Sequence, residues 1–189
     1  MASSPSSLLP LALVVLALVV VAIFSAPAAA TSSCGEKRTH MLVYGHERWP
    51  PAPNATVAQV LPPLQGANAT FFGQVGVLDD ELRTGADPAS DLVGRLQGVF
   101  AGADMEEPSY QTAVSLVFTA GEHRGSTLEL QGRLRVPDHV GAVVERAIVG
   151  GTGALRMARG YSLVKVLSIP PKPVVFQLDL FVFTPVGEY

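Results

Sequence analysis

The sequence predicts an all-β fold, either a β-sandwich or a closed β-barrel. From Thr39 onward, the 189-residue chain consists of short apolar or alternating runs that Gly, Pro and Asp interrupt. No helical periodicity continues beyond about three turns, and many short strands at regular spacing are typical of both folds. Glycines inside strand patterns permit the bends that barrel closure requires, so the barrel is preferred. These glycines are Gly73, Gly76, Gly94, Gly98 and Gly132.

The predicted strands follow one another at short intervals. The clearest runs from Thr127 to Val136, where leucines and a valine alternate with Glu, Gln and Arg, as expected when one face is buried and the other is solvated. With this strand, the sequence has nine candidate strands, and a single small sheet would contain fewer. The others are His40–Tyr44, Thr56–Val60, Phe71–Asp79, Val93–Phe100, Ala113–Thr119, Val143–Val149, Leu155–Val166 and Val174–Thr184.

The last predicted strand is apolar on both faces. Phe176, Leu178, Leu180 and Val182 share one face, and Phe181 and Phe183 lie on the other. A barrel strand that is covered by the core inside and carries large apolar side chains outside indicates a contact on the outer wall. We therefore expect an oligomer.

The N-terminal region has the pattern of a signal peptide. Leu8 to Phe24 is almost purely apolar, no Asp, Glu, Lys or Arg precedes Glu36, and small residues follow Pro27. This predicts cleavage after Ala30, with residues 31–189 forming one domain. The alternative is an uncleaved membrane anchor, because the terminal amine is the only positive charge before the apolar run. The run is short for a membrane span, however, which favours cleavage.

Two N-glycosylation motifs agree with secretion. They begin at Asn54 and Asn68, in loop-like sequence rich in Pro, Ala and Gly. The single cysteine, Cys34, has no internal disulfide partner.

Several function classes are disfavoured. The net charge of −3 does not suggest nucleic-acid binding, and the chain lacks a phosphate loop, a Gly-x-Ser-x-Gly elbow and a His-Glu-x-x-His motif. The four histidines show no ligand spacing, so neither a metal nor another cofactor is predicted. Gly150 to Gly153 is interpreted as a tight turn because a strand pattern, not a helix, follows it.

Arg159 is the most suggestive single residue. It alternates with Leu155, Met157, Tyr161 and Leu163, which would place a guanidinium and a phenol on one apolar strand face. A buried guanidinium needs a partner, and Asp79, Asp80 and Glu47 are the candidates. The opposite face carries Arg156, so the pattern equally allows Arg159 to lie outside.

Five blocks in order resemble the plant dirigent family over roughly residues 40–184. They are Phe72-Gly73-x-Val75-x-Val77-x-Asp79-Asp80, Val93-Gly94-Arg95-Leu96-Gln97-Gly98, Gly125-Ser126-Thr127-Leu128, Val149-Gly150-Gly151-Thr152-Gly153 and Ala158-Arg159-Gly160-Tyr161. The resemblance implies an eight-stranded antiparallel barrel of the kind shared with allene oxide cyclases, usually trimeric and secreted to the plant apoplast or cell wall. Eight is one fewer than the strands counted, so two short runs are expected to form one bent strand or a loop.

The resemblance also implies site residues. Arg159, Asp79 and Asp80 match the family's blocks, and His46-Glu47 stands where the family has His-Asp; Tyr161 and Phe100 are the expected substrate-binding residues. Three departures occur: Ala154 replaces an acid found in pinoresinol-forming members, Phe100 replaces a tyrosine, and the C-terminal cysteine is missing. The first puts lignan cyclisation of that type in doubt.

The implied function is stereochemical guidance. Such a protein binds phenylpropanoid radicals or quinone methides of the monolignol type and directs their coupling towards lignan- or lignin-type products, while a separate laccase or peroxidase makes the radicals. The chain contains no classical catalytic motif, and the sequence leaves open whether such a guide is an enzyme. One alternative is a non-catalytic barrel that carries a small apolar ligand or contributes to the cell wall. Another is an isomerase like allene oxide cyclases, which the secretory signal disfavours because those act in plastids.

Secretion predicts a mature N-terminus at or near Thr31 and glycans on Asn54 and Asn68. Mass spectrometry of protein from plant culture medium, before and after enzymatic deglycosylation, measures both. An intact Met1 on a membrane-bound product would contradict the prediction.

Overall fold

The computed structural model describes residues 35–170 and 172–186. The predicted signal peptide, residues 1–30, and Cys34 lie outside the described residues. Within the described ranges, no helix combines the length and apolar character needed to cross a membrane.

The described chain contains nine β-strands and one short 3-10 helix. The strands are β1 (Glu36–Glu47), β2 (Val57–Leu61), β3 (Val75–Arg83), β4 (Leu92–Gly102), β5 (Ser109–Phe118), β6 (Thr127–Arg135), β7 (Val143–Thr152), β8 (Arg159–Ser168) and β9 (Val174–Pro185); the helix η1 spans Gly153–Leu155.

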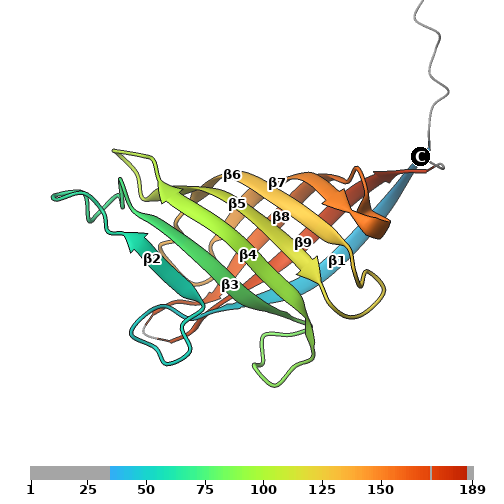
Figure 1. The fold of residues 1–189 in the computed structure, drawn as a ribbon, viewed down its shortest axis with the longest axis horizontal. Helices are drawn as coiled ribbons and strands as arrows, with labels where there is room; N and C mark the ends of the chain where they lie inside the picture. The colour runs from blue at the N-terminus through green and yellow to red at the C-terminus, as the bar shows by residue number, and fades with distance from the viewer. Residues whose placement is uncertain (1–34, 171, 187–189) are drawn as a thin grey trace, which may run out of the picture. The chain divides into compact units, whose positions relative to one another are not determined.

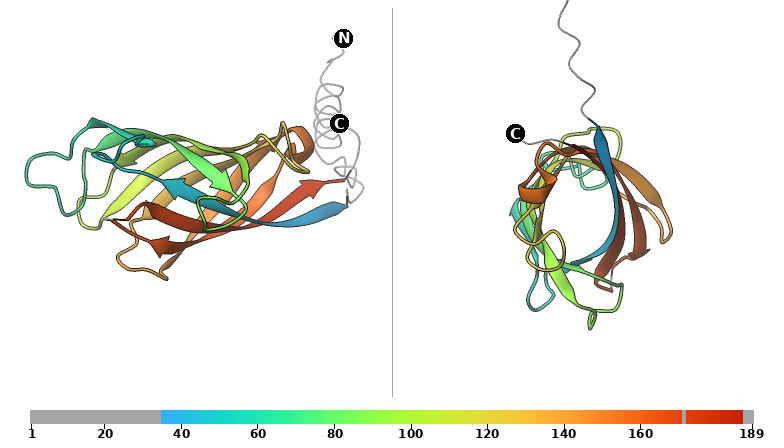
Figure 2. Two further views of the ribbon diagram at one scale, coloured as in Figure 1. Left: turned by 90° about the horizontal axis from the view of Figure 1, so that it is seen from below. Right: turned by 90° about the vertical axis from the view of Figure 1, so that its right-hand side faces the viewer.

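The sheet closes into the predicted eight-stranded antiparallel barrel. Strands β3 to β9 pair in chain order, β9 pairs with β1, and β1 pairs with β3, which completes the ring seen end-on in Figure 2. The ninth strand, β2, pairs with β3 over Val75–Leu78, the part of that strand beyond its contact with β1 (Figure 1). The expectation that two short runs merge into one strand or loop is therefore wrong, since every predicted run contributes to a separate strand.

Two predicted strands begin later than the sequence pattern suggested. Phe71 and Gly73 have φ angles of 63° and 85°, so residues before Val75 form a turn and do not share a strand face with Asp79. Similarly, η1 and Met157, whose φ is 58°, separate Leu155 from β8. Since alternation cannot be carried across such breaks, Leu155 is buried while Met157 and Arg159 are exposed.

Large apolar side chains fill only one end of the barrel interior. Leu116, Phe118 and Leu128 belong to a cluster that η1 extends by inserting Leu155, and Leu180 and Val182 of β9 complete it. Towards the other end, the interior is hollow because aromatic side chains lie along the wall. There Phe176 and Phe100 lie over glycines of the paired strand, Gly45 and Gly76, where an added Cβ would stand 2.2 Å from a ring atom.

Candidate functional site

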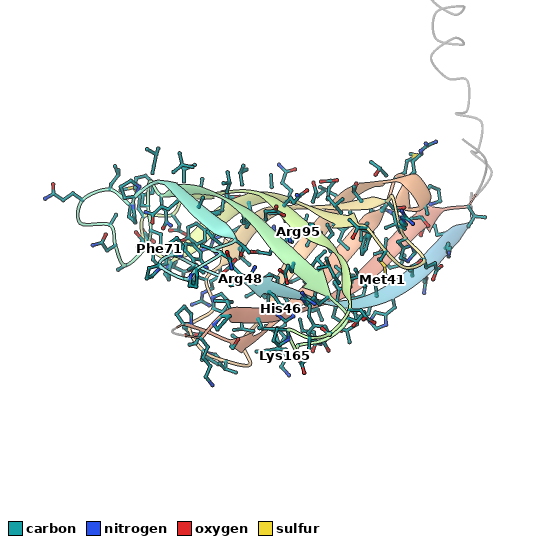
Figure 3. All side chains as sticks on the ribbon, turned by 60° about the horizontal axis from the view of Figure 1, so that its bottom comes forward. Met41, His46, Arg48, Phe71, Arg95 and Lys165 are labelled. Carbon is teal, nitrogen blue, oxygen red and sulfur yellow. The ribbon has the colours of Figure 1, made fainter. Side chains whose placement is uncertain are left out.

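The hollow end contains a cavity of about 570 Å³. Its walls come from the ends of β1, β4, β6 and β8, the beginnings of β3, β5, β7 and β9, the strand β2, and the loops beyond them. Figure 3 shows Phe71 at this end among the loops, whereas Met41 lies towards the other end. The volume lies within the range of small-molecule binding pockets.

Four aromatic rings form one wall of the cavity: Trp49, Phe71, Phe100 and Tyr110. Phe71 stacks on Tyr110 with centroids 5.5 Å apart, and Tyr110 meets the edge of Phe100 at 5.0 Å. Trp49 lies 5.8 Å from Phe100 in a tilted arrangement. Such a wall can bind a flat aromatic ligand through both area and ring geometry.

Two carboxyl groups lie close to this wall. Glu47, the last residue of β1, lines the cavity and accepts a hydrogen bond from the indole N–H of Trp49. Asp80 points inward from β3 behind the wall, is 0% exposed, and accepts a hydrogen bond of 2.5 Å from the Thr56 hydroxyl. Its Oδ2 has no hydrogen-bond partner in the part of the chain that the structure describes. Burial raises the pKa of both groups, and burial together with the charge of Glu47 raises the pKa of Asp80 to about 8. The pair can therefore hold and release a proton near neutral pH.

Tyr110 supplies a hydroxyl that the sequence analysis missed. Its O–H donates to Gln74 Oε1 at 2.9 Å, and burial raises its pKa to about 12, so it stays protonated. The predicted strand began at Ala113 and left Tyr110 outside it. Continuing the same alternation backward from Val114 would have placed Thr112 and Tyr110 on the inner face.

Arg146 is the second residue that the sequence analysis missed. It lines the cavity from β7, is 7% exposed, and donates to the hydroxyl of Thr112. Burial lowers its pKa to about 10, which leaves it cationic at neutral pH. It shares a strand face with Val144 and Ile148, so the argument applied to Arg159 would also have pointed to Arg146.

The structure separates the predicted site residues. Glu47 and Phe100 line the cavity, and Asp80 lies behind its wall, whereas Asp79 lies on the outer face. Asp79 accepts a hydrogen bond of 2.8 Å from Arg95, which lowers its pKa, so it is not a cavity acid. The two neighbours point to opposite faces because they are consecutive in a strand.

Arg159 and Tyr161 also lie on the outer wall. The Arg159 side chain is 61% exposed and pairs with Glu36, and the Tyr161 ring stacks on Phe181. The predictions that Arg159 points into the barrel and that Tyr161 binds substrate there are therefore wrong. The cause is the break at η1 and Met157, which shifts the inward face of β8 to Ser162, Val164 and Val166.

The two predicted glycosylation sites lie in exposed loops. Asn54 precedes β2, and Asn68 lies in the loop between β2 and β3, where it forms part of the cavity lining. No group of three or more His, Cys, Asp or Glu side chains suited to a metal ion occurs in residues 35–170 and 172–186.

The raised pKa of Asp80 predicts a pH-dependent stability. Between about pH 4 and 8, folded Asp80 keeps a proton that the unfolded chain releases, so this group's contribution to the free energy of unfolding falls as pH rises, by at most about 1.4 kcal/mol per pH unit. Asp80→Asn should remove that fall and become increasingly more stable than wild type towards pH 8. Urea unfolding at pH 5 to 8 measures this, with Asp79→Asn as the neighbouring control; parallel curves for wild type and Asp80→Asn would contradict it.

Comparison with known proteins agrees with this fold and confirms the family resemblance. A family model described as "Dirigent-like protein" matches residues 38–183. Dirigent protein 21 of Arabidopsis thaliana is 39% identical over 132 residues, which cover 70% of this chain and 68% of that protein. Pterocarpan synthase 1 of Glycyrrhiza echinata is 35% identical over 150 residues, which cover 78% of this chain and 79% of that protein.

A solved structure agrees with these sequence matches. The pterocarpan synthase dirigent protein GePTS1 matches with a TM-score of 0.73 and 35% identity, over 84% of this chain and 91% of that chain. Sequence and fold thus identify the same group of proteins, and the chain belongs to the dirigent family.

Proposed function

We propose that this protein is secreted and that its cavity binds phenylpropanoid phenols, as radicals or quinone methides, and directs their stereoselective coupling towards lignan- or lignin-type products. The observation that supports this most is a cavity of about 570 Å³ that combines an aromatic wall with a few polar groups. Pockets of this composition bind drug-sized aromatic molecules and orient them through their polar groups. The relatives named as pterocarpan synthases add support, because their names describe products of phenolic chemistry.

The proposed mechanism is mainly positioning. Phenoxy radicals couple without covalent help, so the protein needs only to present one pair of ring faces to each other. The rings of Trp49, Phe71 and Phe100 restrict the orientation of a bound phenol. Glu47, whose pKa burial raises, is placed to exchange a proton with a phenolic or quinone methide oxygen, with Asp80 behind it as a second proton holder.

The chemistry requires an external oxidant. A laccase or peroxidase would make the radicals, which then reach the cavity from solution. Secretion to the apoplast or cell wall, with glycans on Asn54 and Asn68, would place the protein beside such oxidases. The alternative is a barrel that carries a small apolar ligand or contributes structurally to the wall.

A coupling assay distinguishes a protein that directs the stereochemistry of coupling from one that only carries a ligand. With laccase and coniferyl alcohol, wild-type protein should give coupled products in enantiomeric excess, measured by chiral chromatography. Val136→Phe adds bulk to the cavity lining and should reduce that excess, whereas Val99→Phe, at a valine that is 50% exposed on β4, should not. Racemic products from wild type, across a panel of monolignols, would favour the carrier.

We also propose a homotrimer that assembles through the outer wall of β1, β8 and β9. Phe181 stacks between His40 and Tyr161, with 4.8 Å between centroids on each side. Next to this stack, the guanidinium carbons of Arg38 and Arg159 lie 5.7 and 5.8 Å from the Phe183 ring centroid. This row of aromatic side chains on adjacent strands supports a protein contact at this wall, where Arg159 and Tyr161 would act.

An aspartate in this row should dissociate the trimer. Phe181→Asp would bury an unpaired charge at the contact, which costs several kcal/mol, and should yield monomers in analytical ultracentrifugation. Val99→Asp, on the exposed face of β4, is the control that should stay trimeric. A wild-type protein that sediments as a monomer at micromolar concentration would overturn the proposal before any variant is needed.

A further inference from the structure

Arg146 is a buried cation without an acidic partner. The guanidinium contacts the hydroxyl of Thr112, and this hydroxyl itself donates to the Gly132 carbonyl at 3.2 Å. Nε of Arg146 is buried, and no hydrogen-bond partner for it occurs among the described residues. Among the ion pairs of residues 35–170 and 172–186, none includes Arg146, although Arg48, Arg83, Arg95, Arg133, Arg135 and Arg159 all pair with acids. Leaving a guanidinium in this state is unfavourable unless another group compensates its charge.

The acid of the cavity does not compensate it. Glu47 lies at the end of β1, and Arg146 lies on β7, with β9 and β8 between them on one side of the ring and four strands on the other. Burial and the bond to Trp49 shift the pKa of Glu47, burial shifts the pKa of Arg146, and no ion pair joins the two side chains in the described ranges. The cavity therefore has an acidic group and a cationic group on separate walls.

In the described part of the chain, the remaining lining is mostly apolar or aromatic and carries no further charged side chain. Leu134, Val136 and Val164 face the cavity near β7, and Phe100 and Tyr110 continue the aromatic wall. An elongated ligand that satisfies both groups would need a hydrogen-bonding oxygen near Glu47, an aromatic or apolar middle, and an anionic oxygen at Arg146. A phenol has a pKa near 10 and stays neutral at pH 7, whereas a carboxylate is ionised and fits the guanidinium fork.

We propose that Arg146, positioned by Thr112, binds the carboxylate of a phenolic substrate, so that the cavity prefers hydroxycinnamate-type acids to the corresponding alcohols. This inference rests on the proposed function, because it assigns the substrate class of the same cavity. It adds a specificity residue on β7, whereas the family blocks pointed to Arg159 on β8.

The test compares two ligands that differ at one group. Ferulate and coniferyl alcohol share the same ring and side chain but end in a carboxylate and a hydroxymethyl group. Trp49 is the only tryptophan in the sequence and lines the cavity, so quenching of its fluorescence reports occupancy. Titrations with each compound at pH 7 should be made on purified wild-type protein and on Arg146→Met, Arg146→Lys and Arg124→Met, and thermal melting should establish that each variant is folded. Arg124 is an exposed arginine outside the cavity.

Wild type should bind ferulate about tenfold to a hundredfold more tightly than coniferyl alcohol, as expected for a charge-assisted hydrogen bond. Arg146→Met should lose this ratio while keeping its affinity for the alcohol, Arg146→Lys should keep part of it, and Arg124→Met all of it. Equal quenching by both compounds in wild type would overturn the inference and leave the phenol-binding cavity standing. A preference for ferulate that survives in folded Arg146→Met would overturn it too, and binding of neither compound would contradict the proposed function itself.

Discussion

Closure of the barrel depends on a short pairing between β1 and β3. Three residue pairs join these strands, Tyr44 with Arg83, Gly45 with Leu82 and His46 with Glu81. The Nε2–H of His46 donates to the Gly85 carbonyl at 3.0 Å and fastens the same junction to the loop after β3. Because closure fixes the circumference of the sheet, the interior volume is fixed as well, and side chains fill it at one end only. Glu47 follows the junction directly, so the strand pairing that closes the barrel also places an acid at the cavity.

Ionisable side chains have different bonding partners on the outer and inner faces of the barrel wall. On the outside, Asp79, Glu81 and Glu36 pair with arginines. On the inside, the bonding partners of Glu47, Asp80 and Arg146 are the neutral groups of Trp49, Thr56 and Thr112. A neutral partner fixes the position of an ionisable group but supplies no opposite charge. The outer wall is therefore stabilised by ion pairs, whereas the ionisable groups inside can still respond to a ligand.

The sequence predicted the architecture better than the site. The strand expected at Thr127–Val136 occurs as Thr127–Arg135, and alternation correctly divided Leu178, Leu180 and Val182 from Phe181 and Phe183 in β9. These strands are regular, so alternation gives their faces directly. Arg159 was misplaced because a single 3-10 turn and one left-handed residue, Met157, reset the alternation before β8. No such break affects β7, so alternation places Arg146 on the inner face. Alternation alone, however, does not show which inward side chains line the cavity and which pack against other leucines. That difference depends on how side chains from all eight strands fill the interior.

The short strand β2 has a consequence for how the protein can associate with others. It pairs with β3 on one side, and in the described part of the chain its other edge is free. Pro62 and Pro63 follow it directly, Pro50, Pro51 and Pro53 lie shortly before it, and its pairing shifts register between Gln59 and Leu61. Prolines lack the N–H that an added strand would need, and irregular, short edges are poor templates for one. Backbone pairing between molecules is therefore disfavoured at this edge, which protects the barrel against fibre-like aggregation and leaves association to side chains elsewhere on its wall.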